Sequence, residues 1–503
     1  MAIVLTGCVV GSFFAPAKPP VLQPAVQPIT ATLAPQTTLF GVPERGVKPR
    51  FAHLPSTSCA AASCHGSGQI GKLGSEYSAW APEVTPPDGA YDPHSKAYSV
   101  LFNADAARIG KYLDIIPHKS ELCLKCHAVD GAKDEDAQNQ MLAEGAGCGA
   151  CHGPAEKWIS VHFTPEFLAL PDREKWEKYG FVPTKNLVAR TMNCVSCHVG
   201  DVDRDMNHDM IAAGHPRLAF ESARFHYNPQ YRKHWTERGS ETDFEVRAWV
   251  VGQVATLRNA AVLLQARAKR AADGDAKTPW PEFSGLSCYA CHQQIGDKEL
   301  RGGASASTRP LGVPGWEVWS NTAVRVAADY CGEVYPGLSS LQATDMKLTN
   351  VNKLRAMMEK RPSAKDIESQ AKLAVEELDA WLVALQAAGD SKPPSIARDT
   401  PRKIAHALAS NALTPDGAKL ADHDWDALAA NYLGCAAMYH ATGGAAGNSW
   451  GKELKDVHGT LQFPPPGKGA WADSPILTRN KLNQITTDFT QLRKATELSG
   501  GKR

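Results

Sequence analysis

Cysteine and histidine recur together in this chain at a fixed spacing. Four segments read Cys-x-x-Cys-His, and they begin at Cys123, Cys148, Cys194 and Cys288. Another segment, Cys59-Ala-Ala-Ala-Ser-Cys64-His65, ends in the same way but has two more residues between its cysteines; numbered along the chain it is the first of five motifs, and the Cys288 motif is the fifth. Two thiols at this spacing add to the vinyl groups of a porphyrin, and the adjacent histidine is held under the ring as an axial iron ligand. The spacing therefore predicts covalent attachment of c-type haem.

The five motifs divide the cysteines and histidines into roles. Ten cysteines are predicted thioether attachment points: Cys59, Cys64, Cys123, Cys126, Cys148, Cys151, Cys194, Cys197, Cys288 and Cys291. Five histidines are predicted proximal ligands: His65, His127, His152, His198 and His292. Zinc ribbons and redox cysteine pairs are the alternative, but they give no reason for a histidine directly after each second cysteine. Five covalently attached haem c groups are the expected cofactors.

Low-spin haem iron also needs a sixth, distal ligand, usually histidine or methionine. The chain has 17 histidines, so twelve remain once the five proximal ones are subtracted. The strongest distal candidates are His94, His118, His162, His208 and His215. Weaker candidates are His53, His226 and His234, whereas Met192, Met206, Met210, His406, His423, His440 and His458 are expected to be structural.

The strongest distal candidates lie on a predicted helix or close in sequence to a motif. His94 follows Asp92-Pro93, which predicts the first turn of a helix. His118 and His162 each lie within ten residues of a motif. His208 and His215 are seven residues apart, so they would share a face if that segment is helical. On that geometry they would serve two different irons.

The elements that must position these residues are helical. Residues 51–310 carry all five motifs, and helices are expected from 92, from 154 and over 243–272, where apolar residues recur at helical spacing. Strand alternation is scarce. The predicted fold class is mainly α: an irregular multihaem domain of short helices packed around stacked haems, followed by an α-helical domain over 311–503.

The C-terminal part, without further motifs, has strong helical signals. A capping box at Ser363 precedes an apolar stripe that begins at Ile367 and ends at Leu385. Further helices are expected over 424–442 and 475–498. Cys331 and Cys435 either pair in an oxidising compartment or stay as buried thiols.

The N-terminus predicts export, which covalent haem attachment requires. Residues 1–17 contain an apolar stretch, and Leu5-Thr6-Gly7-Cys8 resembles a lipobox, so Cys8 is the lipidation candidate. An ordinary cleaved signal or a retained anchor remains the alternative. Residues 18–50 are rich in proline and read as an extended tether. The expected location is the periplasm, or the membrane surface facing it.

Composition limits the other function classes. The 503 residues suggest roughly two to four structural units. Apolar residues at 43% and charged residues at 21% exclude wholesale disorder and a collagen-like fold. The formal charge of +1, without a long basic run, argues against nucleic acid as the partner. Thirteen cysteines are too sparse for a disulfide scaffold.

Several of these segments carry a family resemblance. They are Cys64-His65-Gly66, Glu76-Tyr77-Ser-Ala-Trp80, Asp92-Pro93-His94 and Gly145-Ala-Gly-Cys148-Gly-Ala-Cys151-His152-Gly153-Pro154. Together they resemble the multihaem cytochromes of the cytochrome c-554 family, tetrahaem electron carriers that serve hydroxylamine oxidoreductase. The resemblance covers about residues 55–235. It implies closely stacked, mostly bis-histidine haems and an electron-transfer role; the fifth motif and the helical C-terminal extension go beyond it.

The leading hypothesis is an exported pentahaem electron carrier with redox donor and acceptor proteins as partners. The alternative is a multihaem oxidoreductase acting on a small nitrogen compound, of the nitrite or hydroxylamine class, at one haem with an open axial position. The Cys-x-x-Cys-Lys motif of the ammonia-forming nitrite reductases does not occur here. A third reading makes the C-terminal helices a docking module. The sequence does not fix the oligomeric state.

Overall fold

The computed structural model describes residues 50–69, 73–81, 92–227, 243–275, 278–292, 313–336, 338, 347–360, 363–390, 394–421, 423–444, 448–463 and 477–498. This part of the chain is mainly helical, without a strand, which confirms the predicted mainly α fold. Four isolated β-bridges are its only extended pairings within the described residues. Cys8, the export region, the proline-rich segment up to residue 49 and His234 lie outside the described residues.

The N-terminal half is built from short elements up to the long α11. The 3₁₀ helices are η1 (Ser56–Cys59), η2 (Pro93–Lys96), η3 (Ser99–Phe102), η4 (Pro117–Lys119) and η5 (Phe283–Gly285). The α-helices are α1 (Glu76–Trp80), α2 (Ala104–Leu113), α3 (Glu121–His127), α4 (Glu135–Glu144), α5 (Cys148–His152), α6 (Pro165–Leu168), α7 (Asp172–Tyr179), α8 (Leu187–His198), α9 (His208–Ala212), α10 (Ser222–Tyr227), α11 (Phe244–Ala272) and α12 (Cys288–Cys291).

The C-terminal half has fewer and longer helices. These are α14 (Val318–Thr322), α15 (Val324–Val334), α17 (Thr349–Met358), α18 (Ala364–Asp390), α19 (Thr400–Asn411), α20 (Trp425–Ala441), α21 (Ser449–Leu461) and α22 (Arg479–Thr496). The predicted cap of α18 is present, because Ser363 Oγ accepts a hydrogen bond from the Asp366 amide at 3.2 Å. The apolar stripe of α18 is buried, with Ile367 and Leu382 both fully enclosed. Local pattern and observed structure therefore agree over α18.

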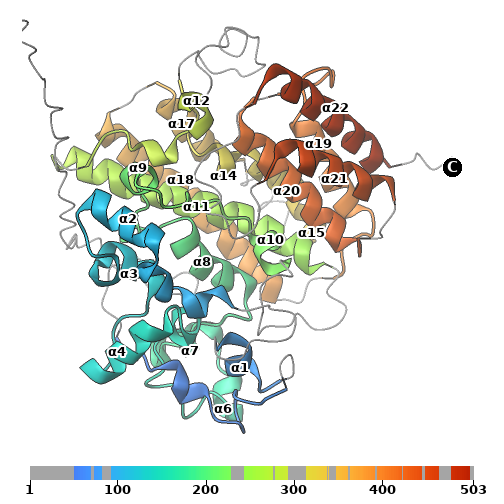
Figure 1. Ribbon diagram of the computed structural model, residues 1–503. Coiled ribbons are helices and arrows are strands. Elements are labelled where there is room, and N and C mark those ends of the chain that lie inside the picture. Colours follow the sequence, from blue (N-terminus) through green and yellow to red (C-terminus); the bar gives the residue numbers. More distant parts are fainter. Residues whose placement is uncertain are drawn as a thin grey trace, which may run out of the picture.

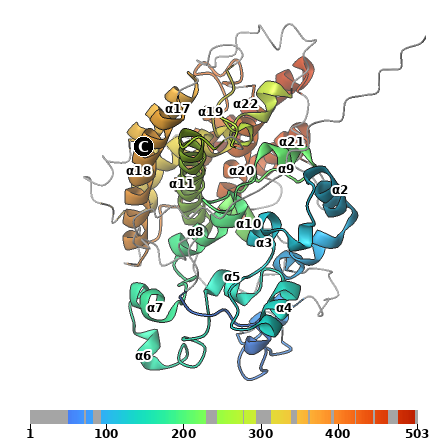
Figure 2. The same cartoon turned by 90° about the vertical axis from the view of Figure 1, so that its left-hand side faces the viewer.

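Helix α11 lies at the centre of the molecule. In Figures 1 and 2 the short helices α4, α6 and α7 lie at the bottom, α19 and α22 lie in the upper half, and α11 runs between them. It packs against α8 and α10 on the haem-motif side and against α15, α18 and α20 on the other. Its side chains from Trp249 to Leu257 include six that are wholly buried: Trp249, Val250, Val251, Val254, Ala255 and Leu257. One hydrophobic core thus includes residues from both halves of the chain.

Two predicted helices differ from the observed structure. The segment from Asp92 is broken into η2, η3 and α2: the His94 carbonyl accepts from the Ala97 amide at 3.1 Å, as a 3₁₀ turn requires, and also from the distant Ala146 amide at 3.0 Å. The segment from Pro154 forms turns, because His162 Nδ1–H donates to the Ile159 carbonyl at 2.9 Å and competes with the backbone for it.

Helix α9 is too short to carry both His208 and His215. It begins at His208 and ends before Gly214, which has a φ of +111°. His215 therefore lies beyond the helix, and the two histidines do not share one helical face. Such a positive φ suits glycine, because it has no Cβ to clash with the backbone.

The two remaining cysteines are buried and separate. The Trp381 indole N–H lies 3.4 Å from Cys331 Sγ, and Cys435 Sγ–H donates to the Ala405 carbonyl at 3.3 Å. Both are free thiols in the structure. Of the two readings open from the sequence, the structure has the unpaired one.

Candidate functional site

Four of the five motifs lie at the ends of helices. They form the last turn of α3 and of α8, the whole of α5, and α12 with His292 as its C-cap. Side chains three and four residues apart meet on one face of a helix. The two thiols and the histidine of each motif are therefore presented to the same side, as attachment to one porphyrin requires.

The first motif is built differently. Cys59 ends η1, and turns carry the chain through Cys64 to His65. The two extra residues are accommodated in these turns, where the Gly66 amide donates to the Ala61 carbonyl at 3.0 Å. The histidine of this motif is held by α1, because its Nδ1–H donates to Glu76 Oε2 at 2.9 Å.

Three motif histidines each face a second histidine from elsewhere in the chain. The ring centroids of His65 and His162 are 6.1 Å apart. Those of His94 and His198 are 6.0 Å apart, and those of His127 and His215 are 6.3 Å apart. Two imidazoles that share a metal place each nitrogen about 2 Å from it, so their centroids lie roughly 6 Å apart. We call these three the facing pairs; each has the separation that one iron between the rings would give.

Hydrogen bonds hold the rings of the facing pairs by one nitrogen. Besides His65, His94 Nδ1–H donates to Asp92 Oδ1 at 2.9 Å and His127 Nδ1–H donates to the Ala97 carbonyl at 2.6 Å. His162 and His215 likewise donate to the carbonyls of Ile159 and Pro216, at 2.9 and 2.8 Å. A histidine bonded in this way keeps Nε2 for a metal, with its tautomer fixed.

In the facing pair of His94 and His198, the pKa values of the two rings are shifted in opposite directions. Burial works to lower the pKa of His94, but the Asp92 carboxylate raises that pKa above its ordinary value. Burial lowers the pKa of His198 to about 4, and His94 adds to the effect. His198 is therefore neutral near pH 7, the form in which imidazole binds a metal.

The attachment cysteines come together in two groups. The thiols of Cys59 and Cys148 lie within hydrogen-bond distance, which brings the first and third motifs side by side. The thiols of Cys126 and Cys197 also lie within hydrogen-bond distance, which brings the second and fourth motifs side by side. Porphyrins attached to the first and third motifs would therefore be adjacent at their attachment points, and so would those attached to the second and fourth motifs.

Two distal candidates, His118 and His208, do not contact a motif histidine in the part of the chain that the structure describes. The His118 ring stacks on Phe102 at 4.4 Å, and the His208 ring lies edge-on to Phe283 at 5.9 Å. Both phenylalanines are exposed, at 58% and 60%.

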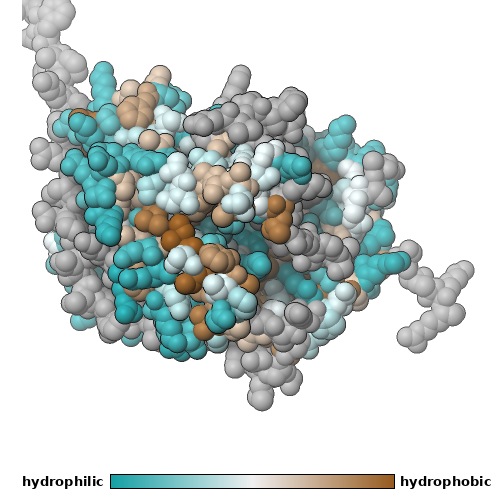
Figure 3. Space-filling view, turned by 90° about the horizontal axis from the view of Figure 1, so that it is seen from below, coloured by the Kyte–Doolittle hydropathy of each residue, from teal (hydrophilic) through white to brown (hydrophobic). Residues whose placement is uncertain are grey.

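Exposed phenylalanine rings recur beside candidate ligands. The ring centroids of Phe163 and His162 are 5.6 Å apart, and those of Phe225 and His198 are 5.2 Å apart. The two phenylalanines, Phe163 and Phe225, are 68% and 39% exposed. Figure 3, seen from below, shows apolar groups interspersed among hydrophilic ones on the surface of the molecule. Large apolar side chains normally gain by burial. A flat apolar cofactor bound at the adjacent histidines would cover these rings, so the residues present fit haem.

Sequence reasoning gave too little weight to three residues. The sequence pattern indicates only a helix cap at Asp92 and only a family resemblance at Glu76, yet both carboxylates hold motif or candidate-ligand histidines. His53, a weaker candidate, is buried beside the third motif, where a Cβ at Gly149 would lie 2.6 Å from His53 Nδ1. For Asp92 the signal was its place two residues before His94.

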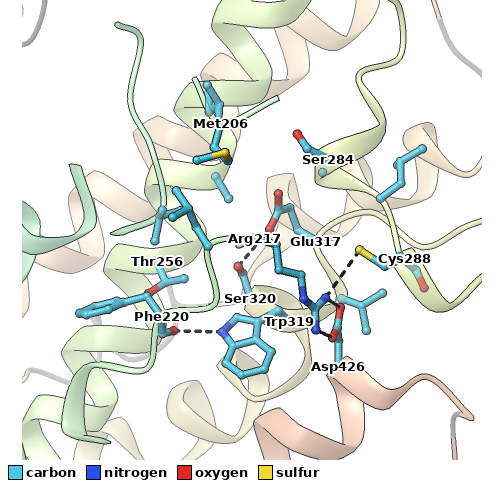
Figure 4. A pocket seen from close by; sticks show the side chains of 18 of the residues that line it. Met206, Arg217, Phe220, Thr256, Ser284, Cys288, Glu317, Trp319, Ser320 and Asp426 are labelled. Atoms are coloured by element: carbon cyan, nitrogen blue, oxygen red, sulfur yellow. Dashed lines mark hydrogen bonds and ion pairs between the residues drawn. The ribbon is translucent and has the colours of Figure 1, made fainter. Parts of the chain in front are cut away.

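The fifth motif lies where the two halves of the chain meet. Cys288 Sγ is 3.6 Å from Arg217 Nη1, and Arg217 forms a two-pronged ion pair with Asp426 of α20 at 2.6 and 2.5 Å. The guanidinium also lies 5.7 Å from the Trp425 ring centre. Figure 4 shows Cys288, Arg217 and Asp426 at the edge of a cavity, whose volume is about 70 Å³.

Comparison with known families gives one match. Residues 89–153 match the family described as cytochrome c554 and c-prime. This segment contains His94 and the second and third motifs. The match supports a c-type cytochrome that carries covalently bound haem and acts in electron transfer with redox partner proteins.

The other comparisons add no relative. Neither the search of curated proteins nor that of solved structures returned a match. Among the described helices, none has the length and apolar character needed to cross a membrane.

Proposed function

We propose that this chain is an exported pentahaem c-type cytochrome that passes electrons between a donor and an acceptor protein. The observation that carries the proposal is the set of three facing pairs, each with the separation expected of two imidazoles on one iron. The family match over residues 89–153 supports the electron-transfer role.

The chain's own residues would hold, orient and tune the cofactors. When bound, each haem supplies a one-electron iron couple. Cysteine thioethers from the five motifs fix the rings, and the motif histidines bind from the proximal side. In the facing pairs the distal ligands are His162, His94 and His215. Two histidine ligands favour a lower reduction potential than histidine with methionine.

For the third and fifth motifs the proposed distal ligands are drawn from His53, His118 and His208. His53 packs on Gly149 within the third motif. His208 lies on α9, which packs against η5, three residues before the fifth motif. The exposed Phe102 and Phe283 beside His118 and His208 are the contacts that a porphyrin would bury.

The location of the protein belongs to the same proposal. Haem attachment outside the cytoplasm, lipidation at Cys8 and a tether over residues 18–50 would place the haem region of residues 51–310 at the membrane surface. Replacing Cys8 by alanine should release the protein from the membrane fraction into the soluble exported fraction. Retention of the Cys8→Ala protein in the membrane would favour an uncleaved anchor.

Haem count and spin state test the proposal directly. The mass of the exported protein should exceed that of the polypeptide by five haems, and four would remove the wider Cys59 motif. Electron paramagnetic resonance should be dominated by low-spin bis-histidine signals. A large high-spin fraction that binds nitrite or hydroxylamine would instead favour the catalytic alternative.

A further inference from the structure

A small polar cavity adjoins the attachment point of the fifth motif. Its volume is about 70 Å³, and its walls come from α11, α14, α20 and the segment around Cys288 (Figure 4). Since one water occupies about 30 Å³ of liquid, the cavity has the volume of about two water molecules. It is too small for an organic substrate, but Ser284, Ser320 and Glu317 give it polar walls.

Glu317 is held in this cavity by a constrained backbone. Its φ of +45° is in the left-handed region, which non-glycine residues rarely adopt. The Glu317 amide donates to the Gly285 carbonyl at 2.9 Å, and the Glu317 carbonyl accepts from Asn321 Nδ2 at 3.1 Å. Such strain is maintained only where the surroundings impose it, and it is concentrated at functional sites.

The charged groups around Glu317 are paired with other partners. Arg267 of α11 binds Asp205 at 2.6 Å and donates to Ser284 Oγ at 2.8 Å. Arg217 binds Asp426 of α20. The Glu317 carboxylate itself accepts a hydrogen bond from Ser320 Oγ at 3.2 Å.

These surroundings leave the carboxyl poised between its two protonation states. Burial raises the pKa of Glu317 to about 7, against the opposing effects of Arg267 and Ser320 and with a further rise from Asp426. A group whose pKa lies near the working pH responds to a small change in nearby charge. Glu282 is a further acidic group near Arg267, whose pKa its charge raises.

We propose that Glu317 is a redox-linked proton acceptor for the haem attached at Cys288. The inference rests on the proposed function, because it requires haem at the fifth motif. One electron from a donor converts Fe(III) to Fe(II), and one proton from solvent converts the Glu317 carboxylate to the carboxylic acid. Oxidation returns both. The added negative charge on the haem favours protonation of a carboxyl that shares a cavity with its attachment cysteine.

The test is a redox titration of the five-haem protein at several pH values, with dithionite as reductant. One component of the wild-type titration should have a midpoint potential that falls as pH rises through about 7. The fall is at most 59 mV for each tenfold drop in proton concentration. In Glu317→Gln this slope should be lost, together with the carboxylic-acid infrared band that appears on reduction of the wild type.

Two further variants keep the test decisive. Glu221 is a second buried glutamate whose pKa burial raises to about 7, but its oxygens accept from the Ala223 and Arg224 amides outside this cavity. Glu221→Gln should therefore keep the slope. Ser320→Ala removes a donor to the ionised carboxylate, so the pH window should move upward.

The outcomes separate the two proposals. Five haems with a slope that persists in Glu317→Gln would overturn the role of Glu317 and leave the carrier function intact. A wild-type protein whose midpoint potentials do not change with pH would also overturn the role of Glu317 and leave the carrier function intact. Absence of haem from the proteolytic peptide that contains Cys288 and Cys291, measured by its mass, would overturn the haem count of the proposed function and this inference with it.

Discussion

At His94 a neighbouring carboxylate decides which ring nitrogen is available to iron. Asp92 is 3% exposed and accepts from both the backbone amide and Nδ1–H of His94, at 3.0 and 2.9 Å. A buried anion on Nδ1 makes the imidazole a stronger donor through Nε2, which stabilises the ferric state.

Asp92→Asn is therefore expected to raise the potential of the haem bound by His94 and His198. Asparagine keeps the shape and the acceptor oxygen but loses the charge. A tenfold loss of ferric preference corresponds to about 59 mV for one electron, which sets the scale of the expected shift. Redox titration measures it. Asp105→Asn is the matched control, because Asp105 is exposed and pairs only with Arg108. Equal potentials in Asp92→Asn and wild type would contradict the assignment.

The distal role of the facing pairs gives a second prediction at this scale. Alanine at His94, His162 or His215 should convert one haem in five from low spin to high spin, because each variant removes one iron ligand. Electron paramagnetic resonance checks the fraction. His406, whose Nδ1–H donates to the Arg493 carbonyl at 3.0 Å, is the control, and His406→Ala should leave the spectrum unchanged. A low-spin spectrum in all three variants would reject the pairing.

Glu221 gives a prediction about stability and pH. Burial raises its pKa to about 7, so between the unfolded value near 4.5 and 7 the folded protein binds more protons than the unfolded chain. The free energy of unfolding contributed by Glu221 therefore falls as pH rises through this window, by roughly 3 kcal/mol in total.

Glu221→Gln removes this loss, because glutamine stays neutral. The variant should gain in melting temperature relative to wild type when measured at about pH 8 rather than at about pH 5. Calorimetry at the two pH values makes the comparison. A constant difference between the two proteins at both pH values would count against the raised pKa.

At the scale of elements, the N-terminus of α20 ties the C-terminal helices to the haem motifs. Asp424 accepts a short hydrogen bond from Ser287, the residue before Cys288, and Asp426 binds Arg217, two residues after His215. The side chains of Arg217 and Asp426 are only 9% and 7% exposed. One helix end therefore supports both the segment that carries the distal candidate His215 and the predicted attachment motif at Cys288.

Asp426→Ala should lower the free energy of unfolding by about 3–5 kcal/mol, because it leaves a buried guanidinium without its partner. Denaturant unfolding measures the loss, and haem content should fall at the fifth motif. Asp329→Ala, in an exposed pair with Arg325, is the control and should cost about 1 kcal/mol or less. Arg217→Met combined with Asp426→Leu should recover much of the loss. If the double variant does not regain the lost free energy of unfolding, Arg217 and Asp426 have a role beyond their ion pair.

Sequence patterns predicted the long helices and missed the breaks in the short ones. Helices α11 and α18 have apolar stripes long enough to define a period, so their bounds were predicted within a few residues. In the 92–113 segment the His94 carbonyl accepts from the distant Ala146 amide, and in the 155–163 segment the Ile159 carbonyl accepts from the His162 ring. Such contacts depend on tertiary neighbours that a local pattern does not contain.

The same distinction applies to the candidate site. The motif cysteines and histidines follow from local spacing, because attachment chemistry fixes which residues must be adjacent. The partner of each motif histidine does not, since His94 of η2 and His198 at the end of α8 are far apart in the sequence and meet only in the folded chain. Distal candidates could be proposed from the sequence, but not paired.

For the whole molecule, α11 makes the two halves of the chain one structure. Arg258 of α11 binds Asp379 of α18 at 2.8 Å, within a contact that includes the fully buried Leu257 and Leu378. On its other side α11 packs against α8, which ends in the fourth motif. The C-terminal helices therefore share a core with the helices that carry the haem motifs, and we expect them to support those motifs rather than to act as an independent module.

A chain cut off after residue 312 is thus expected to lose its haem-binding structure, because it exposes the apolar side of α11 that packs on α15, α18 and α20. Size-exclusion chromatography with haem staining should show aggregate or no recovered protein. The control is a full chain with an inserted protease site within 301–310, cut after folding. Its two halves should elute together with all haems, because the core holds them. A soluble monomer of residues 50–312 with native spectra would instead make the C-terminal helices a separable docking domain.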